Sequence, residues 1–320
     1  MSALYPFLLR PEFVERPWGA RNLSPIYPGH RCEKPVGEVW LTGDENRVSN
    51  GPLAGRTLGE LCREYGRAVV GESARETERF PLLIKFLFPR EMLSVQVHPD
   101  DEAARRVGLP CGKTECWYVL AADPGAQVAL GLKPGTTREQ LAQAICEVRA
   151  EELLNWVDIQ PGEMIYVDAG TVHTIGPGSI LVETQQNSDT TYRLYDYGRP
   201  REIHVELGLA ATKARTRAGK VRRKERTTTL VASPSFIVEK FALTQTRCFE
   251  AVHSPQVVVV LEGAGMAEGR SGGPVSFARG DALVVPAAVA QVGIHPDQGL
   301  EMLRMTLPAE PTPEPETTPG

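Results

Sequence analysis

The stretch that decides the fold reads LSVQVHPDD over residues 93–101 and continues further on as GKTECW over 112–117. Side chains alternate between the two faces of a β-strand, so Ser94, Gln96 and His98 share one face and the valines between them take the other. Glu115, on a second strand-like run, offers a carboxylate that could meet this polar face. Imidazole, carboxylate and amide oxygen together suit a divalent transition metal such as zinc. The alternative is a surface histidine beside the turn that follows His98.

A second histidine, His173, lies in a comparable setting much later in the chain. It belongs to the segment DAGTVHTIG, which follows a turn and the strand-like run MIYV at 164–167. A tight hairpin before His173 would aim its imidazole into a small β-barrel, toward ligands on other strands. Three separated segments thus supply four candidate metal ligands, namely Gln96, His98, Glu115 and His173. This combination indicates a metal site more strongly than either histidine alone.

Length and composition are those of an ordinary globular protein. The chain has 320 residues, which favours two domains, and it is 42% hydrophobic and 23% charged. No apolar run approaches the roughly 18 residues that a membrane span needs. The N-terminus has no basic segment followed by an apolar one, so we expect a cytoplasmic protein without membrane association.

Cysteine usage and net charge exclude further classes. The six cysteines form no CxxC pair, so neither a disulfide framework nor a thiolate zinc site is indicated. A net charge of −5 argues against a broad nucleic-acid surface, and we expect no nucleic-acid partner.

Local patterns predict mostly short strands. We expect extended chain at 5–20, strands at 36–42, 80–88, 115–120, 128–132 and 164–167, and helices at 57–67, from 136 onward and around 151–156. Thr57 followed by Glu60 is typical of a helix N-terminus. Lys85, inside the apolar run FPLLIKFLF, is expected to extend its ammonium group to the strand edge.

Four stretches, in this order and spacing, resemble one known family. They read SVQVHPDD, GKTECWYVL, VDAGTVHTIGPG and ETQQNSDTTYRLYDYGR. Together they are similar to type I mannose-6-phosphate isomerase, or phosphomannose isomerase, in its short bacterial form. The resemblance spans most of residues 12–205 and continues more weakly to about 307. PWGA at 17–20 and LFPR at 87–90 depart from the commoner family sequences, and neither touches a proposed ligand.

The resemblance implies the fold and the reaction. Gly162, Asp168, Gly170 and His173 match the second cupin motif, with Asp168 where proline is commonest. The implied fold is mainly β, with two cupin (jelly-roll) β-barrels and a few short helices between strands. The implied enzyme is a zinc-dependent aldose-ketose isomerase that interconverts mannose 6-phosphate and fructose 6-phosphate through an enediolate. One Zn²⁺ per chain would bind to the four ligands named above, and Arg193 would be the catalytic arginine.

The reaction needs a base, an electrophile and a grip on the phosphate. Glu183 is the candidate base, because strand alternation can place it on the inner face, and Asp189 is expected to orient Arg193. Lys113 and Ser94 are expected to bind the phosphate, with Lys85 as a third contact. Lys113 is also counted among the catalytic residues, with Arg193 and Glu183. The alternative for Glu183 and Asp189 is an ordinary salt bridge with Arg193.

Four regions are expected along the chain: a metal-binding catalytic domain at 1–205, a basic linker at 206–226, a degenerate second cupin domain at 227–307 and a disordered tail at 308–320. The second domain repeats half of the cupin motif, but Ala288 and Gln291 stand where the glycine and the histidine would be. It is therefore expected to lack the metal.

Two other functions remain open from the sequence. One is a bicupin that binds a metal or a sugar phosphate as a sensor or structural module, without turnover. The other is an iron-dependent oxygenase, which normally requires two or three histidines, whereas only His98 and His173 occupy motif positions. The charged residues Lys113, Glu183, Asp189 and Arg193 favour the isomerase, because a purely structural zinc site would not need them. We expect a small-molecule sugar phosphate as partner, and a monomer or a weak homodimer.

Overall fold

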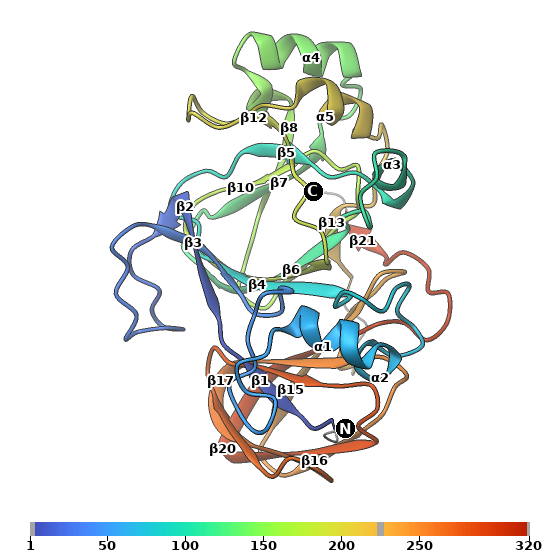
Figure 1. The fold of residues 1–320 in the computed structure, drawn as a ribbon. Coiled ribbons are helices and arrows are strands. Elements are labelled where there is room, and N and C mark those ends of the chain that lie inside the picture. Colours follow the sequence, from blue (N-terminus) through green and yellow to red (C-terminus); the bar gives the residue numbers. More distant parts are fainter. Residues whose placement is uncertain (1–3, 223–226, 319–320) are drawn as a thin grey trace.

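The computed structural model describes residues 4–222 and 227–318. It confirms a mainly β fold with a few helices, because three antiparallel sheets account for most of the secondary structure (Figure 1). The strand pairings in this part of the chain leave each sheet open, and none closes into a barrel.

Two of the sheets face each other and share a core. Trp117 and Val119 of one sheet pack in the same apolar cluster as Val128 and Ile175 of the other. The larger sheet has eight strands in the order β2 (Glu12–Ala20), β3 (Val36–Trp40), β4 (Leu82–Leu87), β11 (Ser179–Gln186), β6 (Glu115–Ala122), β9 (Met164–Val167), β13 (Gly219–Val221) and β21 (Thr317–Thr318). The smaller sheet has five, in the order β12 (Tyr192–Tyr195), β5 (Val95–Val97), β10 (His173–Ile175), β7 (Gln127–Leu132) and β8 (Leu154–Asp158).

Short helices lie between the strands, and two begin at capping boxes. Thr57 Oγ1 accepts from the Glu60 N–H and Glu60 accepts from the Thr57 N–H, as the sequence predicts. The predicted helix after 136 ends before Val148, whose side chain is 62% exposed. The helices are α1 (Leu58–Tyr65), α2 (Arg67–Val70), α3 (Asp101–Arg106), α4 (Arg138–Cys146), the 3₁₀ helix η1 (Ala150–Leu153) and α5 (Val205–Ala211). The helical turn predicted at 151–156 is wrong in its second half, where β8 begins.

The third sheet contains the strands between residues 229 and 306 and one strand from the N-terminus. Phe7 pairs with Val284 and Leu9 pairs with Ala282, and both side chains are buried there. The first strand therefore lies outside the sheets formed by the rest of residues 1–205 (Figure 1). The order is β1 (Phe7–Leu9), β19 (Ala282–Val285), β17 (Gln256–Gly269), β20 (Gln291–Thr306), β15 (Ile237–Leu243) and β14 (Thr229–Ala232), with β16 (Arg247–Glu250) on β20 and β18 (Val275–Ala278) on β17.

The expected linker and tail contain secondary structure in their described parts. Helix α5 occupies the start of the segment 206–226, and β13 pairs with β9. Residues 223–226 lie outside the described residues. Within 308–318, β21 pairs with β13, and the hydroxyl of Tyr166 donates to Glu314. These contacts differ from the disorder expected for the tail.

The third sheet meets the α2 region through backbone groups. The N–H of Ala287 donates to Val69 O and that of Ser73 donates to His253 O. Gly71 (φ +75°) is so close that a Cβ would lie 2.2 Å from His253 O. None of the helices described here is long and apolar enough to cross a membrane.

Candidate active site

A buried group of two histidines and a glutamate lies between the two facing sheets. His98 directly follows β5, Glu115 begins β6 and His173 begins β10. All three residues are 1% exposed, and one potential ligand atom from each lies within 4.8 Å of the others. The Nε2 atom of His98 is 3.5 Å from Glu115 Oε2, and that of His173 is 3.4 Å from Glu115 Oε1. This group could hold a metal ion.

Backbone carbonyls orient both imidazoles. His98 Nδ1 is 2.8 Å from Thr190 O, and His173 Nδ1 is 2.9 Å from Thr171 O. A carbonyl only accepts, so each Nδ1 carries the hydrogen and each Nε2 presents a lone pair to the group. Burial lowers the pKa of His173 to about 4, and burial with the nearby Lys113 ammonium holds the pKa of His98 well below its ordinary value. Both rings are therefore neutral at pH 7, as metal binding requires.

The Glu115 carboxylate fits a cation better than it fits the protein around it. Neither oxygen receives an aligned hydrogen bond from the described residues, although both are buried. The Lys113 ammonium lies 2.8 Å from Glu115 Oε2 and 3.0 Å from His98 Nε2. Lys113 thus supplies one positive charge to this buried carboxylate, and the two imidazole lone pairs beside it are donors that suit a divalent metal.

Gln96, the fourth predicted ligand, lies next to His173 across the β5–β10 pairing. Its amide nitrogen is 3.2 Å from His173 Nε2, and its amide oxygen accepts from Ser94 Oγ at 3.2 Å. Gln96 could ligate a metal only through the oxygen, and a half-turn of the amide exchanges the two atoms. The structure thus brings all four predicted ligands together, with Gln96 presenting its nitrogen.

Lys85 is buried, contrary to the prediction that its ammonium reaches the strand edge. The residue is 3% exposed, and Nζ lies 3.4 Å from Glu38 Oε2 and 3.3 Å from Glu183 Oε2. Burial alone would lower the pKa of Lys85, but the carboxylates of Glu38 and Glu183 outweigh it and the pKa is raised. The partners come from β3 and β11, on either side of β4, so compensation from neighbouring strands makes the burial possible.

Glu183, the predicted base, faces the same interior. Trp117 Nε1 donates to its Oε1 at 3.2 Å, and the side chain is almost fully buried. Burial and the charge of Glu115 raise the pKa of Glu183, while Lys85 opposes them. A raised pKa makes a carboxylate a stronger base near neutral pH.

The predicted partnership between Asp189 and Arg193 is wrong, as is the salt bridge of Arg193 with Glu183. Asp189 is largely exposed and its nearest ion partner is Lys85, at 4.0 Å. Arg193 donates from Nη1 to Glu202 O, and its buried Nε has no partner among the described residues. Burial, followed by the charge of Arg201, lowers the pKa of Arg193.

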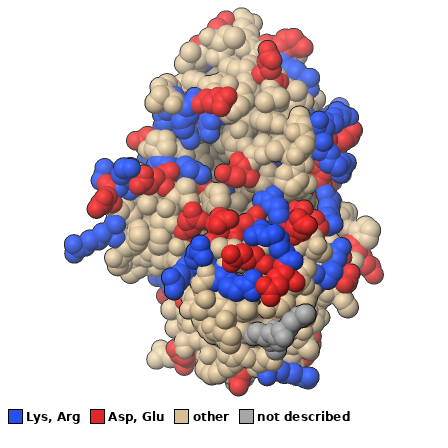
Figure 2. All heavy atoms as spheres, viewed as in Figure 1, with Lys and Arg blue, Asp and Glu red and all other residues tan. Residues whose placement is uncertain are grey.

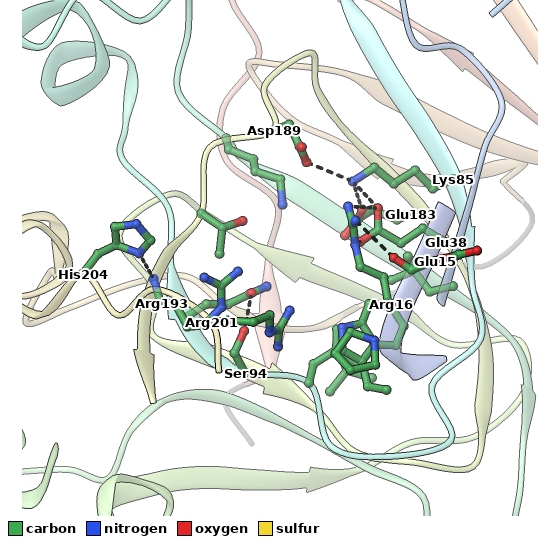
Figure 3. A pocket seen from close by; sticks show the side chains of 18 residues that line it. Glu15, Arg16, Glu38, Lys85, Ser94, Glu183, Asp189, Arg193, Arg201 and His204 are labelled. Carbon is green, nitrogen blue, oxygen red and sulfur yellow. Dashed lines mark hydrogen bonds and ion pairs between the residues drawn. The ribbon is translucent and has the colours of Figure 1, made fainter. Parts of the chain in front are cut away.

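A cavity of about 420 Å³ joins these groups. Figure 3 shows Lys85, Glu38 and Glu183 gathered on one side, while Arg193 and Arg201 extend toward Ser94 on the other. Gln96, Lys113 and Asp189 also line it, whereas the remaining three metal-binding candidates lie behind the lining. The outer surface carries both charge signs interspersed on the face drawn in Figure 2, without a broad basic area.

Comparisons with known proteins identify the family of this chain. Residues 8–124 match the family described as "Phosphomannose isomerase type I, catalytic domain". Mannose-6-phosphate isomerase ManA of Bacillus subtilis (strain 168) is 36% identical over 307 residues, which cover 89% of this chain and 94% of that protein. The chain belongs to the type I mannose-6-phosphate isomerase family. A mannose-6-phosphate isomerase of Streptococcus mutans is also 36% identical, over 81% of this chain and 86% of that protein.

Solved structures of this family have the same fold. The mannose 6-phosphate isomerase from Bacillus subtilis superposes with a TM-score of 0.82 at 31% identity, covering 94% of this chain and 99% of the other. A putative mannosephosphate isomerase from Archaeoglobus fulgidus has a TM-score of 0.77 over 95% of this chain and 98% of the other, and its 21% identity supports the fold alone.

Several charged or ring-bearing residues of the cavity were missed by the sequence analysis, among them Glu38, Arg16, Arg201 and His204. Arg16 donates from Nε to Glu38 Oε1 at 2.8 Å, and Trp40 Nε1 donates to Glu38 Oε2 at 2.6 Å. Arg201 makes two bonds to the buried Asp196, and the His204 Nδ1 accepts from the Arg193 N–H. Glu38 could have been suspected, because it interrupts the apolar strand VGEVW. The other three lie in segments without a local pattern.

Proposed function

We propose that this chain interconverts mannose 6-phosphate and fructose 6-phosphate through an enediolate, with one zinc ion. The observation that carries the proposal is the cavity itself. It places a buried carboxylate base, two arginines and Gln96 around one space of about 420 Å³, with the other three proposed metal ligands behind its lining. The relatives named mannose-6-phosphate isomerase support the substrate.

His98, Glu115 and His173 would hold the zinc, and Gln96 would complete the set through its amide oxygen. The neutral imidazoles and the buried carboxylate without aligned donors fit this ion. When bound, zinc would polarise a substrate oxygen and balance developing negative charge. We further propose that the two facing sheets form a cupin domain, and that the third sheet, with β1, forms a second one without metal.

Glu183 would move the proton between C1 and C2. Its carboxylate is held by Trp117 and Lys85, so it has one orientation toward the cavity. Lys85 keeps a positive charge beside it and prevents burial from making Glu183 permanently neutral.

Arg193 would stabilise the enediolate oxygen, because its guanidinium lines the cavity and has a buried N–H without a partner among the described residues. Lys113, which contacts Glu115 and His98, belongs with the reacting centre rather than with the phosphate. Ser94 and Arg201 would bind the phosphate, since Lys85 already serves two carboxylates.

A coupled assay for fructose 6-phosphate tests the proposal. The purified chain should turn over mannose 6-phosphate, lose activity with a chelator and regain it with zinc. Tight binding of mannose 6-phosphate without turnover would instead establish the non-catalytic binding module. That outcome is disfavoured by a buried base and arginines that binding alone does not require.

A further inference from the structure

Lys113 lies in a short irregular segment, residues 111–114, between α3 and β6. Within this segment three consecutive N–H groups each have an acceptor. Gly112 donates to Asp101 Oδ1 at 2.8 Å, Lys113 donates to Pro99 O at 3.0 Å and Thr114 donates to Gln186 Oε1 at 2.9 Å. Two of the three acceptors are side-chain atoms, so side chains here satisfy backbone N–H groups that a neighbouring strand would satisfy in a sheet.

The two acceptor side chains are joined to each other. Gln186 Nε2 donates to Asp101 Oδ1 at 2.9 Å, and the other oxygen of Asp101 pairs with Arg75. The Gln186 N–H donates to Thr114 O at 3.2 Å, so both ends of that residue are held. Gly112 is required at this contact, because a Cβ there would lie 2.6 Å from the carbonyl carbon of Asp100.

Neither side chain lines the cavity that contains Lys113. Asp101 and Gln186 line a separate cavity of about 540 Å³, together with Arg75 and Cys111. They therefore have no contact with a substrate bound at the site. Their effect on the reaction has to pass through the backbone of residues 112–114.

We infer that Asp101 and Gln186 are positioning residues that fix the backbone around Lys113 and so keep its ammonium in the cavity, beside the metal group. The inference rests on the proposed isomerase activity, in which Lys113 belongs to the reacting centre. Removal of the Asp101 or Gln186 side chain leaves the N–H of Gly112 or Thr114 without its acceptor, and residues 111–114 can then shift. A misplacement of about 1 Å at a reacting group lowers turnover by about a hundredfold.

The first experiment compares Gln186→Ala with the wild type. We expect kcat to fall about ten- to a hundredfold, with KM within about twofold and zinc content unchanged. Hydrogen exchange at the amides of 112–114 should accelerate, while exchange in the third sheet stays the same. Gln143→Ala is the matched control, because Gln143 is an exposed α4 residue whose side chain donates to Glu147, four residues further on.

The second experiment uses Asp101. Asp101→Asn keeps an oxygen for the Gly112 N–H and should retain most of kcat, whereas Asp101→Ala should behave like Gln186→Ala. If Gln186→Ala does not fold, the comparison of Asp101→Asn with Asp101→Ala still tests whether these side chains position Lys113. Equal damage in both Asp101 variants would show that the Arg75 ion pair matters instead, and would overturn the inference.

Two further results would contradict it: unchanged exchange at 112–114 in Gln186→Ala, or loss of zinc and of protection throughout the chain. Failure of the proposed function is separate, because it would show as an inactive wild type. Amide exchange does not depend on turnover, so it would still test whether Asp101 and Gln186 hold the backbone of residues 112–114.

Discussion

Lys85 and Glu183 are direct partners across the β4–β11 pairing, with 3.3 Å between Nζ and Oε2. Glu38, on the other side of β4, holds the same ammonium at 3.4 Å. One buried cation thus serves two buried carboxylates from flanking strands. The pairing fixes the proposed base without needing any residue outside the sheet.

Glu38→Gln should destabilise the protein by about 2–3 kcal/mol at pH 7, because it removes one of the two carboxylates closest to Lys85 and leaves Glu183 and the more distant Asp189. Burial alone would raise the pKa of Glu38, but the positive charges of Lys85 and Arg16 outweigh burial and lower the pKa to about 2. A carboxyl with a depressed pKa stabilises the fold above its unfolded pKa, about 4.5, and loses this contribution as the pH falls toward about 2.

Denaturant unfolding between pH 7 and pH 3 measures this effect. The difference between the wild type and Glu38→Gln should shrink as the pH falls below about 4.5. Glu15→Gln, which removes an exposed pair with Lys34, should change the unfolding free energy by less than about 1 kcal/mol. A difference that stays constant with pH would contradict the assignment.

His98→Ala and His173→Ala should each lose bound zinc and activity together, because each removes one lone pair from the group. Metal analysis of the purified chains measures this. His204→Ala is the control: it changes a histidine of the same cavity that is not in the metal group and should keep about one zinc per chain. Full zinc in either of the first two variants would direct attention to His253 and His295 in the C-terminal half.

Arg193→Ala should lower kcat by about a hundredfold or more while zinc stays bound, if its guanidinium acts on charge that develops in the transition state. Arg193→Lys should recover only part of the rate, since lysine lacks the planar fork. Kinetics with mannose 6-phosphate and metal content check both, with the exposed Arg10→Ala as control. A rise in KM alone would make Arg193 a phosphate contact instead.

Gly71→Ala should destabilise the fold by about 2 kcal/mol more than Gly55→Ala, a position that also has a positive φ. At Gly55 an added Cβ meets nothing within 4 Å, whereas at Gly71 it would meet His253 O. Thermal unfolding of both variants isolates the contact between α2 and the third sheet. Equal losses would show that backbone conformation alone limits Gly71.

Local sequence pattern predicted the features that depend on neighbours in the chain. Alternation placed Gln96 and His98 toward the interior, and the Thr57–Glu60 spacing identified a helix start. Lys85 was misjudged because its compensating carboxylates come from other strands, and a strand's own sequence does not name its neighbours. Arg193 was given the wrong partner for the same reason, since its acceptor is a backbone carbonyl, Glu202 O.

The pairing of Phe7 with Val284 has a consequence for synthesis. At about 5–20 residues per second, a ribosome makes residue 284 roughly 15–55 s after residue 7. During that time β1 has apolar side chains and no β19 to pair with, so it remains exposed to chaperones or to wrong strand partners. Assembly of the third sheet is therefore a late event in the life of a nascent chain, even though one of its strands is made first.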